Sequence, residues 1–363
     1  MTSRSQHRRR RCAPAATVAG CALALAACSG GTHPAARPAS PTTSAAQPQP
    51  SATTTTRPPA PARRPVYALT GLPVTEPAKA HRPALSVKID NISAALPQAG
   101  LDRADLVTES LVEGGLTRLM ATFQSHDAGA IGPIRSARPV DTDLLRELRG
   151  GYFAYSGANR HEIVRVREQS TALLISWDAT PGPFWTDPHR AAPHWVFSST
   201  SKLYDWGHRL RPKAAAPEQL FTYSAAAPAG RAVSSAHLRF SSFTTADWRW
   251  NRSTHRWLRD QDGRPDALVG GHQIGTTNVV MLQVAVAGTP YHDHAHNPVP
   301  WVIVVGHGPC WVLRDGKLVQ GTWHRSSAKV AVRIVDRAGK VVALRPGQTW
   351  LELIPRPYQP SFG

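Results

Sequence analysis

The sequence has little cysteine, and most of it lies at the amino-terminal end. Of its four cysteines, three fall within the first 28 residues (Cys12, Cys21 and Cys28), and the fourth is Cys310. A long segment with a single cysteine cannot form an internal disulfide, so its stability must come from a packed core. Cys310, beside Trp311 in a valine-rich stretch, is expected to be a small buried hydrophobic residue.

Long apolar runs are also missing. The apolar run over 13–27 is shorter than the roughly 20 residues that a membrane-spanning helix needs. It follows a basic, acid-free head and ends in Leu25-Ala26-Ala27-Cys28, and this order predicts a signal peptide over 1–27. The last four residues resemble the bacterial lipoprotein signal, which implies lipidation of Cys28. The alternative is an ordinary cleaved signal in which this cysteine is incidental.

Residues 29–65 contain no large apolar residue and consist mainly of Gly, Pro, Ala, Ser, Thr and Gln. Such a segment cannot bury enough surface to offset its ordering entropy, so we expect a disordered tether over 28–65. At about 3.1 Å per residue in a polyproline II conformation, the tether could reach on the order of 100 Å. The expected location is therefore the extracytoplasmic face of the cell membrane, with the chain anchored through lipid on Cys28.

Acidic residues are scarce: 24 Asp and Glu stand against 42 Lys and Arg, which gives a formal charge of +18. Nine arginines in the predicted signal and tether account for half of this charge, so about +9 belongs to the folded part. A basic exported domain favours acidic partners at the cell surface and does not indicate a nucleic-acid partner.

From Val66 onward the residue pattern predicts an α+β fold, with a mixed-sheet amino-terminal domain that carries helices and a β-rich meander domain after it. The expected parts are the first domain at 66–210, a linker at 211–235, the second domain at 236–355 and a tail at 356–363. In the first domain, strands are expected at 85–90, 106–112, 116–123 and 172–177, and helices at 141–149, 160–169 and 200–210. Alternation over 85–90 predicts a strand with one exposed face.

A series of short motifs occurs in order along the chain: Leu69–Pro73, Ile89–Asn91, Pro97–Leu101, Val112–Arg118, Ile131–Arg138, Arg190–His194, Thr276–Val280, Gly321–Trp323 and Pro346–Trp350. Together they resemble the YerB-like lipoproteins, an uncharacterised bacterial two-domain family of the domain-of-unknown-function 3048 type. The resemblance covers roughly residues 66–355. It implies an α+β fold around a mixed sheet and export as a lipoprotein, and it brings no established reaction.

The first half also concentrates the residues that could bind a ligand, namely Arg118, Arg135, Arg138, His194, Asp90, Glu109 and Glu113. A guanidinium matches a carboxylate or phosphate with two parallel hydrogen bonds, so the three arginines suit an anion. The alternative is that they pair with the three acids and only fix the loop. On a regular strand Glu109 and Glu113 would share a face about 13 Å apart, which exceeds the ~5–9.5 Å of a glycosidase pair.

Three other patterns carry weaker signals. Ser136 lacks the sequence context of a nucleophile and needs His194 and an acid beside it. His292, His294 and His296 could share a strand face as metal ligands, although a loop is expected there, and no metal or cofactor is predicted. Trp248 and Trp250 could form a sugar-stacking platform, although tryptophans in a β meander usually belong to the core.

The sequence therefore favours a lipid-anchored cell-envelope protein that binds without catalysis. Its expected partner is an anionic or glycan-bearing envelope polymer or an envelope protein. The alternatives are an envelope hydrolase or transferase with a carboxylate and histidine site, and a purely structural assembly partner.

Overall fold

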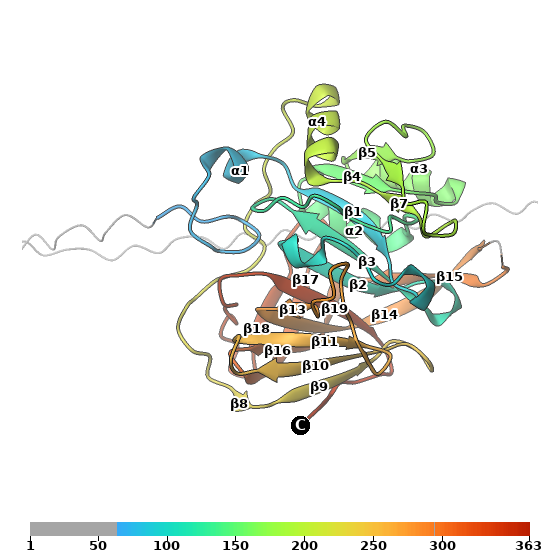
Figure 1. Cartoon of the computed structure of the whole chain (residues 1–363). Helices are drawn as coiled ribbons and strands as arrows, with labels where there is room; N and C mark the ends of the chain where they lie inside the picture. The colour runs from blue at the N-terminus through green and yellow to red at the C-terminus, as the bar shows by residue number, and fades with distance from the viewer. Residues whose placement is uncertain (1–63, 294) are drawn as a thin grey trace, which may run out of the picture. The chain divides into compact units, whose positions relative to one another are not determined.

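The structure is a computed structural model that describes residues 64–293 and 295–363 (Figure 1). The predicted signal peptide, the lipidation site at Cys28 and all of the predicted tether except its last two residues lie outside the described residues, as does His294. Within the described part, no helix is both long and apolar enough to cross a membrane.

One long mixed sheet runs through both halves of the chain. Its central path, in spatial order, is β18 (Arg333–Asp336), β17 (Lys317–Arg325), β16 (Gly306–Arg314), β14 (Asn278–His292), β19 (Thr349–Pro355), β2 (Leu106–Leu111), β3 (Thr117–Phe123), β1 (Leu85–Asp90), β4 (Tyr152–Tyr155) and β5 (Leu173–Ser176). Two further strands join it, β15 (Pro298–Ile303) beside β14 and β8 (Arg231–Ala232) beside β17. β19 lies parallel to both β14 and β2, so a carboxy-terminal strand joins the two halves.

A second, antiparallel sheet packs across the lower part of the long one in Figure 1. It contains β12 (Arg264–Pro265), β11 (Arg256–Gln261), β10 (Thr245–Asn251), β9 (Ser235–Arg239) and β20 (Ser361–Phe362), with β13 (Gly275–Thr276) beside β11. β6 (Trp185–Thr186) and β7 (Val196–Phe197) form a separate two-stranded ribbon. The mixed sheet is as expected, but the second half is not a single meander, because its strands divide between two sheets.

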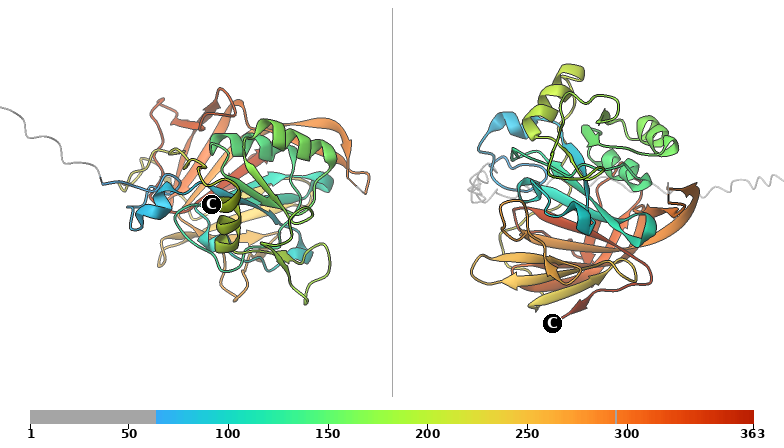
Figure 2. Two further views of the ribbon diagram at one scale, coloured as in Figure 1. Left: turned by 90° about the horizontal axis from the view of Figure 1, so that it is seen from above. Right: turned by 45° about the vertical axis from the view of Figure 1, so that its right-hand side comes forward.

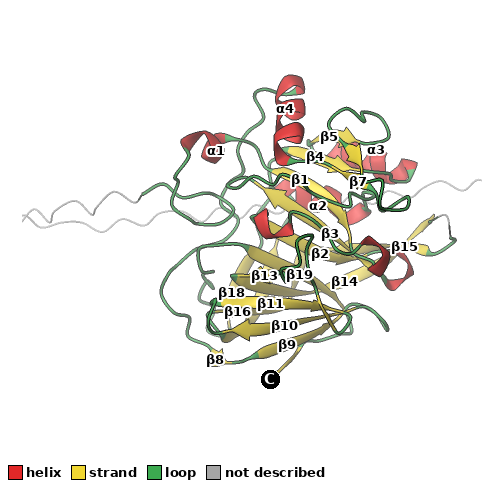
Figure 3. Cartoon of the chain, in the orientation of Figure 1, coloured by secondary structure: helices red, strands yellow, loops and turns green. Residues whose placement is uncertain are grey.

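The helices gather near the β1–β4–β5 end of the long sheet (Figure 3). The α-helices are α1 (Pro77–His81), α2 (Pro139–Glu147), α3 (Arg160–Gln169) and α4 (Thr200–Leu210), and the short 3-10 turns are η1 (Ser93–Ala95), η2 (Leu101–Arg103) and η3 (Glu113–Gly115). The three helices predicted from the sequence are present within about two residues of the expected bounds. Asn159 caps α3 through the amide of Glu162, and Ser199 caps α4 through the amide of Lys202.

The two faces of the long sheet support separate cores. One face packs against the second sheet and α4, and its core includes Trp248 and Trp257, both fully buried. The other face packs against α2 and α3, with Val140 and Val166 in its core. Trp248 is therefore core and not a sugar-binding platform.

Two segments are more buried than the sequence suggested. β1 was expected to have an exposed face, but all six residues are buried because α2 covers the face that carries Lys88. The segment 211–235, which was expected to be a linker, contributes the buried Leu220 and Phe221, and the Tyr223 hydroxyl donates to the Leu69 carbonyl at 2.6 Å.

Candidate functional site

Arg118 lies at the centre of a polar cluster on the α2–α3 side of the long sheet. In the strand register it is directly opposite Asp90 of β1 on one side and Ser110 of β2 on the other. Its guanidinium donates from Nη1 to the Ser136 carbonyl at 3.3 Å, while its Nε and the Ser110 hydroxyl are buried without a hydrogen-bond partner. Polar atoms buried without partners are rare in native proteins and are usually explained by water or a bound ion.

Arg118 differs from the other buried arginines. Five arginines of the described residues are buried, and four of them have a carboxylate within 4.0 Å: Arg138, Arg259, Arg314 and Arg325. Arg118 has none, although only 8% of it is exposed. Burial, together with the positive charge of Arg138, lowers the pKa of Arg118 to about 9. The guanidinium is therefore charged at neutral pH but lacks a full counter-charge.

Asp90 joins two of the predicted residues beside Arg118. Its Oδ2 accepts from Arg135 Nε at 2.9 Å and lies 2.7 Å from Nδ1 of His194. The loop that carries His194 is fixed by Arg190, which donates to the Ala95 carbonyl at 2.9 Å. Arg135 and His194 have side chains 20% and 14% exposed, so this end of the cluster reaches solvent.

Arg138 forms the opposite end of the cluster. Its Nε donates to Glu113 at 2.6 Å, and its Nη1 lies 3.7 Å from Glu162 of α3. The carboxylate of Asp141 occupies the amino terminus of α2, since it accepts from the Arg138 amide at 2.7 Å and pairs with the fully buried Lys88 at 2.7 Å. The start of α2 is therefore already neutralised by its own carboxylate.

The two glutamates that the spacing placed on one strand face lie in different networks. β2 ends at Leu111, and Glu113 belongs to the 3-10 turn that follows, where Gly114 and Gly115 have positive φ angles of 65° and 71°. The prediction of one shared face was wrong because the strand does not continue through the Gly-Gly turn. Glu113 contacts the arginine cluster, whereas Glu109 does not.

Glu109 lies on the opposite face of the sheet, between the two sheets. Its carboxylate accepts from Arg259 at 2.6 Å, and Arg259 also binds Asp266. Glu352 of β19 is directly beside Glu109 in the register, and burial with this neighbouring charge raises the pKa of Glu352 well above its usual range. The exposed fraction of all four side chains is close to zero, so this network joins the two sheets and offers no access to a ligand.

The weaker sequence signals do not converge on chemistry. Within the described residues, the hydroxyl of Ser136 has no hydrogen bond, and His194 is oriented by Asp90 rather than by a serine. β14 ends at His292, His296 lies in the turn that follows, and His294 is outside the described residues. Across residues 64–293 and 295–363, no group of three or more His, Cys, Asp or Glu side chains is placed to hold a metal ion.

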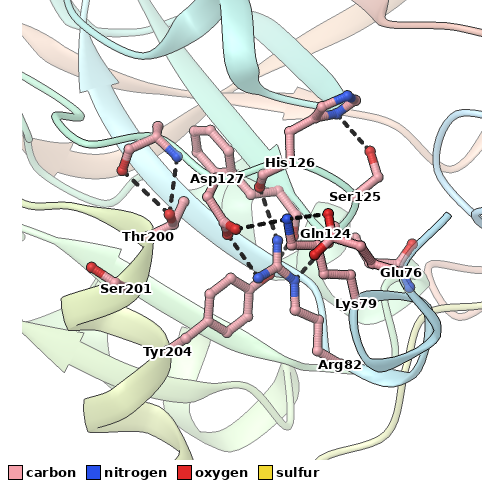
Figure 4. A network of polar contacts seen from close by, with 12 residues as sticks. Glu76, Lys79, Arg82, Gln124, Ser125, His126, Asp127, Thr200, Ser201 and Tyr204 are labelled. Atoms are coloured by element: carbon pink, nitrogen blue, oxygen red, sulfur yellow. Dashed lines mark hydrogen bonds and ion pairs between the residues drawn. The ribbon is translucent and has the colours of Figure 1, made fainter.

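A separate polar network lies at the carboxyl end of β3 (Figure 4). Arg82 donates to the Gln124 and His126 carbonyls and pairs with Asp127 at 2.8 Å, and its guanidinium lies 4.2 Å from the centre of the Tyr204 ring. Each of the three guanidinium nitrogens donates one hydrogen bond, so the network ties α1 and α4 to the end of β3.

Nearby, the Ser125 hydroxyl donates directly to Asp105 at 2.5 Å and lies 2.7 Å from the His126 ring. A nucleophilic triad needs the histidine between the hydroxyl and the acid. Here the same nitrogen, Nδ1 of His126, faces both the hydroxyl and Asp105, which lies 3.3 Å away, so the three residues do not form such a triad.

Glu162 is a member of the cluster that the sequence did not single out. It is 2% exposed, and burial raises the pKa of Glu162 to about 7. Its position three residues after the cap Asn159 is the signature of a capping box, and this spacing gives no indication of a further role.

Both halves of the chain match one protein family. Residues 69–213 match the N-terminal domain and residues 236–351 match the C-terminal domain of the family described as a protein of unknown function (DUF3048), so the chain belongs to this family. It is 25% identical over 300 residues to "Putative lipoprotein YerB" of Bacillus subtilis (strain 168), a match that covers 79% of this chain and 85% of that protein. The crystal structure of YerB from Bacillus subtilis has a similar fold, with a TM-score of 0.70 at 21% identity, over 82% of this chain and 100% of that one.

Proposed function

We propose that this protein is anchored to the membrane through lipid on Cys28 and binds an anionic envelope polymer without catalysis. The single observation that carries this proposal is Arg118, a buried guanidinium with no carboxylate partner among the described residues. A phosphate or carboxylate group of a polymer would supply the missing counter-charge and accept from the free Nε.

The neighbours of Arg118 support an anion rather than a cation in this position. The positive charges of Arg138 and Arg135 both lower the pKa of Arg118, and the Arg135 side chain extends toward solvent. Asp90 and Glu113 each hold one of these arginines in place, so the guanidinium groups are oriented before a ligand arrives. Preorganised donors lower the ordering cost of binding.

Two observations support the membrane anchor. The amino-terminal sequence has the order of a lipoprotein signal that ends at Cys28, and the relative from Bacillus subtilis carries the name of a putative lipoprotein. A lipidated end and a long tether would hold the basic domain at the outer side of the membrane, where anionic polymers are present.

Polyphosphate and polygalacturonate test the proposal, since one presents phosphate groups and the other carboxylates. Residues 66–363 should bind at least one of them, and Arg118→Gln should weaken binding about 10-fold or more, in line with the loss of a charge-assisted hydrogen bond. Arg135→Ala with Arg138→Ala should also weaken it. Arg252→Gln, at an exposed arginine of the β10–β11 turn, is the matched control and should bind normally. Equal binding by Arg118→Gln and wild type would refute the proposal.

A second candidate function is an envelope hydrolase or transferase, and one observation favours it. Asp90 lies 2.7 Å from Nδ1 of His194, which is how a carboxylate orients a catalytic histidine. Turnover of an envelope polymer should then disappear in His194→Ala and fall in Glu113→Gln. Glu109→Gln should leave the chemistry intact in a folded protein, because Glu109 is closed off between the sheets. Unchanged turnover in His194→Ala would exclude this site.

A further inference from the structure

A pocket of about 240 Å³ lies between α3 and the β14–β15 hairpin. Figure 2 shows this hairpin, in orange, beside the green helices α2 and α3. Its walls include His161, whose ring stacks on Tyr291 at a centroid distance of 4.3 Å, and Trp301, whose ring lies 3.9 Å from the guanidinium carbon of Arg165. Two stacked pairs therefore hold flat side chains around the opening.

Three side chains that line the pocket have a buried polar atom with no hydrogen-bond partner. These atoms are Oε1 of Glu162, Nε of Arg165 and Nε1 of Trp301. Glu162 is 2% exposed, and its second oxygen is engaged at the start of α3. A buried polar atom without a partner costs roughly 1–3 kcal/mol, and a polar occupant that reaches these three atoms would offset that cost.

The charges around the pocket argue against an ionic occupant. Glu162 and the nearby Asp143 oppose an anion, while Arg165 and Arg138 oppose a cation. The partnerless atoms comprise one acceptor and two donors, which match hydroxyl or amide groups that both donate and accept. Drug-sized ligands fill roughly 300–1,000 Å³, so the pocket suits a single ring.

We infer that this pocket binds one uncharged sugar ring, with its hydroxyl or acetamido groups on Glu162, Arg165 and Trp301. This inference rests on the proposed polymer-binding function and adds a sugar as the second unit that is recognised. The pocket and the arginine cluster are neighbours, because Nη1 of Arg138 lies 3.7 Å from Glu162. A polymer with alternating sugar and anionic groups could occupy both.

Gly288 provides a way to fill the pocket without disturbing the protein. It lines the pocket, and a Cβ built there meets no atom within 4 Å. Gly288 lies two residues beyond Val286, which packs on the α2–α3 side, so a side chain at 288 points to the same face. Gly288→Val should therefore block the pocket. Gly129→Val, at an exposed glycine that also has free space around its Cβ position, is the matched control.

The test uses methyl α-glucoside and N-acetylglucosamine, with saturation-transfer NMR and tryptophan fluorescence as readouts. The wild-type protein should bind one of them with a Kd on the order of 1 mM, Gly288→Val should abolish binding, and Gly129→Val should retain it. No saturable binding of either sugar by the wild type would overturn the inference. Equal binding by Gly288→Val and the wild type would do the same.

Trp301→Phe tests the same pocket by a route that does not add bulk. It keeps a ring under Arg165 and removes the partnerless donor, so sugar binding should weaken about 3- to 10-fold while the melting temperature is unchanged or higher. Equal affinity in a folded Trp301→Phe would contradict the role of this donor.

Polyphosphate separates the two proposals, because it carries no sugar. Gly288→Val should bind polyphosphate as the wild type does, whether or not the sugar inference is correct. Arg118→Gln should still bind the sugar. Binding of the sugar by the wild type, with binding of neither polyphosphate nor polygalacturonate, would refute the anion site alone.

Discussion

Replacing Arg118 by methionine should stabilise the free protein. The fall of its pKa from 12.5 to about 9 corresponds to roughly 5 kcal/mol of unfavourable ionisation, as an upper limit. Methionine keeps most of the apolar contacts and loses the hydrogen bond to the Ser136 carbonyl, which is worth about 1.5–3 kcal/mol for a charged donor. The expected net gain in the free energy of unfolding is roughly 1–3 kcal/mol.

The same replacement at Arg138 should have the opposite effect. Arg138→Met leaves the carboxylate of Glu113 buried without its partner and removes the nearest positive charge from Glu162. Breaking a buried pair in this way costs about 3–5 kcal/mol. The two arginines are neighbours in one cluster. Opposite changes in the free energy of unfolding would therefore be due to the missing counter-charge of Arg118 and not to its position in the protein.

Urea unfolding and thermal unfolding at pH 7, both followed by tryptophan fluorescence, measure both changes on residues 66–363. At about 2–4 °C per kcal/mol, Arg118→Met should melt several degrees above the wild type and Arg138→Met at least 6 °C below it. Arg118→Met should also lose polyphosphate binding, so stability and binding move in opposite directions. A loss of stability in Arg118→Met similar to that of Arg138→Met would show that Arg118 is an ordinary structural residue.

Three other predictions concern the rest of the chain. Arg259→Met strands the carboxylates of Glu109 and Asp266, so it should cost about 3–5 kcal/mol at pH 8. Burial raises the pKa of Asp266, so the cost should be smaller at pH 5; an equal loss at both pH values in urea unfolding would contradict this. Burial raises the pKa of Glu147 from 4.5 to about 7, so its contribution to stability is present below pH 4.5 and lost as the pH rises through 7. Stability should therefore fall between pH 5 and 8, and Glu147→Gln should flatten that fall; an unchanged slope would argue against the shift. Cys28→Ala should release the protein from membranes in a fractionation assay, and continued lipid labelling would exclude this cysteine as the anchor.

The elements that depend on local sequence could be predicted closely. The helix α3 has a cap at Asn159, a Glu at the third position and an end at Ser170, all within a short window. The strand β1 was also located correctly, but the face that was expected to be exposed is buried. Alternation shows which residues share a face and says nothing about what covers that face, and here the cover is α2, with Asp141 paired to Lys88.

The candidate site was predicted in part for the same reason. Residue types and order identified Arg118, Arg135, Arg138 and His194, and five of the other six predicted residues lie around Arg118. Glu109 could not be separated from the others, because its position depends on Arg259, which is 150 residues away in the sequence. The strand was expected to end before the Gly-Gly pair, as it does, but the comparison of Glu109 with Glu113 treated it as continuous. The missing partner of Arg118 has no sequence signal, because it depends on which carboxylates the fold brings close.

The place of β19 has a consequence for the order of folding. This strand, Thr349–Pro355, lies between β14 and β2, and it is the last long strand of the chain. Until it emerges during synthesis or export, β2 has an unpaired edge, and the sheet that carries Arg118 is open on that side. The amino-terminal half therefore cannot complete its fold before nearly the whole chain is available, so a truncation before residue 349 should leave an aggregation-prone edge in the half that it does not touch.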